Sequence, residues 1–159
     1  MLNDTDVVFL RRAIALAQRS RVHGNHPFGA LLVDAAQQVV LEAENTFVTT
    51  RDCTGHAETN LMRLASQRFD RATLAHCTVY TSTEPCAMCA GAIHWGGVGR
   101  VVYALSEARL YALIGSHHDN ETMRLPCHEV FARCDRPVQV IGPALEAEAE
   151  QVHMGFWTR

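Results

Sequence analysis

The chain has 159 residues, of which 48% are hydrophobic and 19% charged, and its net charge is −3. This length suits one ordinary domain, so we expect residues 1–159 to form a single domain, and the composition excludes intrinsic disorder. No apolar run approaches the ~18 residues of a membrane span, and the acidic N-terminus is unlike a signal peptide. We therefore expect a cytoplasmic protein that does not enter a membrane.

The predicted elements alternate between helices and strands. Apolar periodicity predicts a helix over residues 5–21, and two β-rich runs near 28–34 and 38–46 then form a hairpin. Residues 115–136 are polar and irregular. The other elements are expected as helix 56–69, strand 77–81, helix 85 or 86 to 95, strand 100–104, weak helix 106–114, strand 137–141 and helix 143–156. This order predicts an α/β sandwich with helices on both faces of a sheet.

Two short motifs carry the chemistry, and each opens a predicted helix: His56-Ala57-Glu58 and Pro85-Cys86-Ala87-Met88-Cys89. A helix start gathers free N–H groups and the positive end of the dipole, which stabilise thiolates. Cys86 and Cys89 point to the same side of a helix, and His56 supplies a third ligand. Three protein ligands leave a fourth position for water, which is the pattern of a catalytic zinc site.

Glu58 favours an enzyme over a structural site. It lies two residues from His56, so its carboxylate is expected beside the metal, where it can take a proton from zinc-bound water and return it to a substrate nitrogen. A Cys-x-x-Cys pair alone also fits a redox or regulatory module, but such a pair predicts no His-x-Glu motif. A structural zinc site would take a fourth ligand from the remaining cysteines, which are Cys53, Cys77, Cys127 and Cys134.

Together the motifs resemble the cytidine deaminase-like superfamily of zinc-dependent deaminases, in particular its guanine deaminase and tRNA adenosine deaminase branch. The resemblance extends from about residue 10 to 142 and rests on Pro27-Phe28-Gly29-Ala30, Asn45, His56-Ala57-Glu58 and Thr83 to Ile93. It implies a three-layer α/β/α sandwich with a five-stranded mixed sheet, one Zn²⁺ per chain and a homodimer. It also implies hydrolytic deamination, with Glu58 as the proton carrier and ammonia as a product.

Five residues are candidates for binding the substrate. The Asn45 amide can donate and accept hydrogen bonds at a purine edge, and the resemblance assigns the Ala57 backbone N–H to the reacting centre. Phe28 can stack on a base or pack in the core. Trp95 is expected in a pocket wall or a dimer contact. Asp119 can accept from purine N–H groups, although it also fits a plain loop.

We expect the substrate to be a small aminopurine, with guanine as the first candidate. Deamination of a tRNA adenosine is the alternative, and the motifs also permit a pyrimidine, a triazine or a nucleoside. The negative charge, together with an acidic run at Glu146, Glu148 and Glu150, disfavours nucleic acid. Net charge can nevertheless hide a local basic patch, for which the candidates are Arg63, Arg68, Arg71, Arg100 and Arg109.

Three aromatic side chains are further candidates near the pocket. His26 can reach the pocket mouth, although a position on the surface is the commoner outcome for a histidine in a loop. Phe156 and Trp157 resemble the aromatic C-terminal element that closes some pockets of the superfamily. The alternative for both is packing within a terminal helix.

Overall fold

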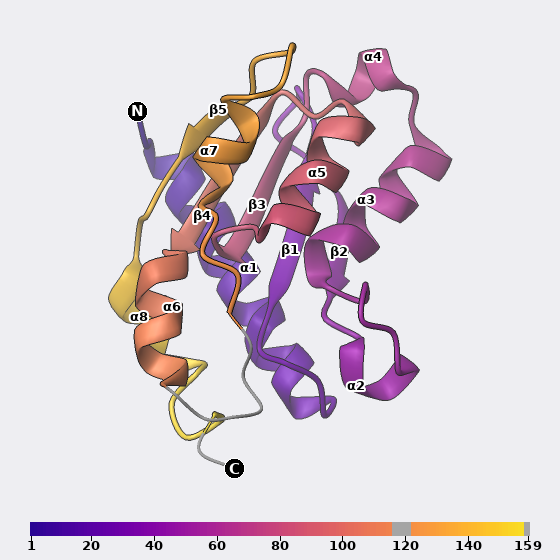
Figure 1. Ribbon diagram of the computed structural model, residues 1–159. Coiled ribbons are helices and arrows are strands. Elements are labelled where there is room, and N and C mark those ends of the chain that lie inside the picture. The colour runs from indigo at the N-terminus through magenta and orange to yellow at the C-terminus, as the bar shows by residue number, and fades with distance from the viewer. Residues whose placement is uncertain (116–121, 158–159) are drawn as a thin grey trace.

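A five-stranded mixed sheet forms the centre of the computed structural model, which describes residues 1–115 and 122–157 (Figure 1). The strand order is β2-β1-β3-β4-β5. Strand β1 pairs antiparallel with both β2 and β3, whereas β3, β4 and β5 run parallel. The strands are β1 (Gly29–Val33), β2 (Val39–Glu44), β3 (Thr78–Thr83), β4 (Arg100–Leu105) and β5 (Gln139–Ile141). The predicted mixed sheet is confirmed.

Helices cover both faces of this sheet (Figure 1). Side chains alternate along each strand, so Leu32 and Val79 belong to one apolar cluster while Leu31 and Tyr80 belong to the other. The first cluster includes residues of α3 (Ala57–Arg68), α5 (Ala87–Gly96) and α7 (Cys127–Phe131). The second includes residues of α1 (Asp4–Val22), α6 (Glu107–Ile114) and α8 (Glu146–Gln151). This is the predicted three-layer sandwich.

Two parts of the chain differ from the expectation. The polar stretch 115–136 contains α7, where only Cys127 and Phe131 are buried, a spacing of one turn that is too short to give a periodic signal. The last helix begins at Glu146, not near 143, because Leu145 adopts a left-handed backbone conformation with φ 58°. Two single-turn helices, α2 (Phe47–Thr50) and α4 (Arg71–Leu74), also form in the connections. Among the described residues, no helix combines the length and apolarity required to cross a membrane.

A buried carboxylate ties α1 to the centre of the sheet. Asp6 is 1% exposed and accepts hydrogen bonds from the Tyr80 hydroxyl at 2.7 Å and from two Arg100 nitrogens at 2.9 Å. Arg100 begins β4, whereas Leu105 ends it. The network therefore lies at the opposite end of β4 from the carboxyl edge, which is where parallel strands usually place a binding site.

Candidate active site

Two helix starts meet at the carboxyl edge of the sheet. His56 is the N-cap residue of α3 and Cys86 is the N-cap residue of α5, and these two helices pack against each other (Figure 1). Neither side chain caps its own helix by a hydrogen bond. Both are consequently available to face one another, and Cys89 follows on the first turn of α5.

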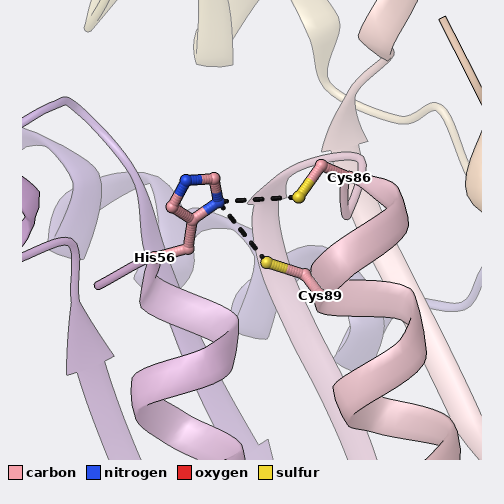
Figure 2. Close-up of side chains that lie close together, drawn as sticks. All are labelled: His56, Cys86 and Cys89. Carbon is pink, nitrogen blue, oxygen red and sulfur yellow. Dashed lines mark hydrogen bonds between the residues drawn. The ribbon is translucent and has the colours of Figure 1, made fainter. Parts of the chain in front are cut away.

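The structure brings the three predicted metal ligands together (Figure 2). The His56 Nδ1 atom lies 3.5 Å from the Cys86 Sγ atom and 3.6 Å from the Cys89 Sγ atom. Bond lengths of about 2.0–2.1 Å for Zn–N and about 2.3 Å for Zn–S place N and S about 3.6 Å apart at a tetrahedral angle. The donor types and their separations therefore fit one Zn²⁺.

The other cysteines stand outside this set. Among the described residues, the His, Cys, Asp and Glu side chains that converge in this way are His56, Cys86 and Cys89 alone. Cys53, Cys77, Cys127 and Cys134 contribute no fourth ligand to the group. A site with three protein ligands has the open coordination position of catalytic zinc, not the closed set of a structural site.

The two thiols differ in their protonation. Hydrogen bonds with Cys89 and with His56 outweigh the effect of burial and lower the pKa of Cys86 to about 4. The hydrogen bond between the two thiols raises the pKa of Cys89, as does its burial. The Cys86 contact also raises the pKa of His56. Because zinc binds thiolates and neutral imidazole, metal binding at this site releases protons.

Glu58 lies beside the ligand group and is buried, with 5% of its surface exposed. Its Oε1 atom accepts a hydrogen bond from the Thr81 hydroxyl at 2.6 Å, and its Oε2 atom lies 3.4 Å from the Cys89 sulfur. Burial raises the pKa of this carboxyl group. A raised pKa helps a carboxyl group to hold a proton, as well as to accept one, which a general acid and base must do.

A cavity of about 910 Å³ opens at this edge, and His56, Glu58 and Cys86 lie in its wall. Aromatic rings form much of the remaining wall: His26, Phe28, Phe47 and Trp157. The His26 and Phe47 rings stack with their centroids 5.0 Å apart, and the Trp157 ring lies 5.5 Å from His26. The volume lies within the range of small-molecule pockets, and flat rings suit a flat heterocycle.

Asn45 has one hydrogen-bonding group without a partner. The residue is 1% exposed, and its Oδ1 atom accepts from the Phe47 backbone N–H at 3.0 Å. Its Nδ2 atom is buried and has no partner among the described residues. The sequence left both donation and acceptance open for this amide. The structure uses the oxygen once as an acceptor and leaves Nδ2 as the group without a partner among the described residues.

The remaining substrate candidates fall in different places. Phe28 lines the cavity, and Ala57 is the first residue of α3, where helix N–H groups lack intrahelical partners. Trp95 is 75% exposed and is not among the residues that line the cavity in the single chain, which favours the dimer contact over the pocket wall. It lies nine residues along α5 from Cys86, which is ~13 Å at the helical rise. Asp119 falls outside the described residues.

Sequence reasoning missed several polar residues at the cavity. Thr81 holds Glu58, and Glu84 accepts backbone hydrogen bonds from Glu107 at 2.9 Å and Cys127 at 3.0 Å. Glu84 directly follows β3 and Glu107 lies two residues after the end of β4, and both line the cavity. The rule that ligands bind at the carboxyl ends of parallel strands is the signal that could have found them.

The mixed sheet, the His/Cys/Cys group at two helix starts and the adjacent buried glutamate define a zinc-dependent deaminase. Residues 3–105 match the family described as the cytidine and deoxycytidylate deaminase zinc-binding region, and the chain belongs to this family. The predicted superfamily is thus confirmed.

Three similar proteins illustrate the range of this family. A probable cytosine deaminase of Schizosaccharomyces pombe is 39% identical over 98% of this chain and 94% of its own length. A tRNA-specific adenosine deaminase of Haemophilus influenzae is 33% identical over 73% of this chain and 67% of its own. The X-ray structure of guanine deaminase from Bacillus subtilis superposes with a TM-score of 0.59 at 31% identity, covering 79% of this chain and 83% of that one.

Proposed function

We propose that this chain binds one zinc ion through His56, Cys86 and Cys89 and hydrolytically removes the amino group of a free nucleobase, with guanine as the first candidate. The observation that carries the proposal is the buried Glu58 carboxyl group, which lies beside the ligand group in the wall of a cavity lined by aromatic rings. When bound, zinc supplies a Lewis acid that acidifies water. The overall reaction consumes one water, replaces the amino group by a carbonyl and releases ammonia.

Glu58 carries the protons in this reaction. Hydrolysis requires one proton to leave the water and protons to reach a ring nitrogen and the departing amine. The Thr81 hydroxyl holds Oε1 at 2.6 Å, which fixes the carboxyl group and leaves Oε2 as the atom for proton transfer. The raised pKa keeps the group able both to accept and to donate a proton.

The unpartnered Asn45 amide supports a substrate that offers a hydrogen-bond acceptor. Its buried Nδ2 needs an acceptor, and a nucleobase supplies either a carbonyl oxygen or a ring nitrogen. This contact alone does not separate guanine or cytosine from adenine. The 39% identity to a probable cytosine deaminase over nearly the whole chain makes cytosine the second candidate.

Ammonia release from a panel of substrates tests the proposal. The panel contains guanine, cytosine, adenine, their nucleosides and an anticodon stem-loop that bears a target adenosine. We expect release from guanine, and we expect Glu58→Gln to keep zinc while losing at least ~10²–10⁴-fold in kcat. Glu129→Gln, on the exposed face of α7, is the matched control. Inosine formed in the RNA with no ammonia from any free base would overturn the proposal.

A further inference from the structure

One glutamate in the cavity wall takes no part in the metal site or in the proposed proton transfer. Glu58, Glu84 and Glu107 all line the cavity. Both oxygens of Glu84 accept backbone N–H groups, so this side chain serves to hold α6 and α7 against the end of β3. Glu107, the first residue of α6, is only 5% exposed and still faces the cavity.

The hydrogen bonds available to Glu107 do not satisfy its carboxylate. The Tyr111 hydroxyl lies 3.2 Å from Oε1, but it lies closer, at 2.9 Å, to the carbonyl oxygen of Met123. A tyrosine has one proton, and the shorter contact takes it. The Leu125 backbone is the other donor that acts on this group. An ionised carboxylate can accept about four hydrogen bonds, so acceptor capacity remains unused among the described residues.

The electrostatic surroundings of Glu107 also show that its negative charge is poorly compensated. Burial raises the pKa of Glu107, and the nearby Glu84 and Cys86 raise it further. A buried carboxylate with unused acceptor sites carries a desolvation cost that a bound N–H donor removes. Whatever its protonation state, Glu107 is a buried side chain whose carboxyl group faces an open cavity.

Glu107 and Glu58 enter the cavity from opposite faces of the sheet. Helix α3, which carries Glu58, packs in one apolar cluster, and α6, which carries Glu107, packs in the other. Figure 1 shows the two helices on opposite sides of β1 and β3. A base whose amino-bearing carbon faces Glu58 therefore presents its far edge to α6.

We propose that the Glu107 carboxylate accepts a hydrogen bond from the ring N–H that a free base carries and its N-glycoside lacks. The inference rests on the proposed function and adds a basis for selecting free bases over nucleosides. In guanine the N–H belongs to the imidazole ring, away from the amino-bearing carbon. In cytosine it is N1–H, across the ring from the amino-bearing carbon. A sugar at either nitrogen replaces the hydrogen, so the buried carboxylate loses its partner and meets a bulky group instead.

Kinetics with methylated bases test this directly. We would measure ammonia release from guanine and cytosine and from 9-methylguanine and 1-methylcytosine, with each methylated base also tested as a competitive inhibitor. The proteins are the wild type, Glu107→Ala, Glu107→Gln and the surface control Glu129→Gln. The wild type should prefer the unmethylated base. Glu107→Ala should lower kcat/KM for that base by about 10- to 100-fold, mainly through KM, the loss expected for one hydrogen bond to a charged group.

Several outcomes separate this inference from the function on which it rests. The methylated bases should be unaffected by Glu107→Ala, and Glu107→Gln should lose less because its amide oxygen still accepts. Glu107→Gln also carries the test if the alanine variant fails to fold. An equal loss for base and methylated base, or a wild type that deaminates nucleosides as well as bases, overturns the role of Glu107 and leaves the deaminase intact. A wild type that releases no ammonia from any base overturns both.

Discussion

Removing the Asp6 carboxylate should destabilise the fold by about 3 kcal/mol. Breaking a buried ion pair by deleting one partner costs about 3–5 kcal/mol, because the other charge stays buried. Arg100 retains 22% side-chain exposure and can recover some hydration, which places the loss at the lower end of that range. Asp6 also accepts from the Asn3 backbone N–H at 3.0 Å in a capping box, so Asp6→Ala additionally loses part of a helix cap.

Urea unfolding followed by circular dichroism at pH 7 measures this loss. Asp4→Ala is the matched control, since Asp4 lies in the same first turn but is exposed and should contribute no more than about 1 kcal/mol through the helix dipole. Activity per folded molecule should be unchanged, because Arg100 lies at the opposite end of β4 from the cavity. A loss for Asp6→Ala no greater than that for Asp4→Ala would refute the reasoning.

The same network sets an acid dependence of stability. Burial alone would raise the pKa of Asp6, but hydrogen bonds from Arg100 and Tyr80 outweigh it and hold the pKa below its ordinary value. A lowered folded-state pKa contributes stability that is complete above the unfolded pKa of about 3.9 and is lost as pH falls through the folded pKa. The stability difference between the wild type and Asp6→Ala should therefore shrink below about pH 4.

The other predictions concern the metal and the assembly. Replacing both Cys86 and Cys89 by alanine should abolish zinc binding and lower thermal stability, because metal binding is coupled to folding; metal analysis of the purified variant decides this, and full zinc occupancy would contradict the assignment. We also expect a homodimer in which the exposed Trp95 is a contact, so light scattering should give twice the mass of the 159-residue chain and Trp95→Arg should shift it to a monomer. A wild type that is monomeric at micromolar concentration would reject the dimer.

The three residues proposed as metal ligands could be picked out from the sequence because their chemistry depends on local spacing. Cys86 and Cys89 are close on any helix that begins at Pro85, and His56 opens the other helix of the same layer. Glu58 was predicted from the same argument. To predict these residues it is enough to assume that the two helices pack side by side. No other long-range contact is needed.

The remaining features of the site depend on contacts that the sequence does not reveal. The Asn45 nitrogen lacks a partner among the described residues while its oxygen bonds to the Phe47 backbone, a geometry set by the turn after β2. Glu107 gains its importance from burial against Glu84, which depends on the register between β3 and β4. The choice between the two expectations for Trp95, a pocket wall or a dimer contact, depends on its distance from the site, and nine helical residues separate it from Cys86.

The acidic run at the C-terminus is a weaker argument against RNA than the sequence suggests. Glu148 pairs with Arg11 at 2.9 Å, and Glu150 pairs with Arg109. Glu146 accepts hydrogen bonds from the Ser106 backbone and hydroxyl. Exposed pairs of this kind add little stability, but each cancels a charge that would otherwise repel a phosphate chain. The case for a small substrate therefore rests on the cavity and its unpartnered polar groups.

The arginines suspected of a hidden basic patch do not form one surface either. Arg100 is bound to Asp6 beneath α1, and Arg109 is paired with Glu150 on the face that carries α6 and α8. The other three belong to the opposite layer and lie along α3 and α4: Arg63, Arg68 and Arg71. Arg68 lies twelve residues from His56, which is ~18 Å along α3. The arginines of this layer therefore lie toward the far end of α3 from the proposed metal ligands. A phosphate backbone that held a nucleotide over Glu58 would gain little from these five side chains, in agreement with the proposal that the substrate is a free base.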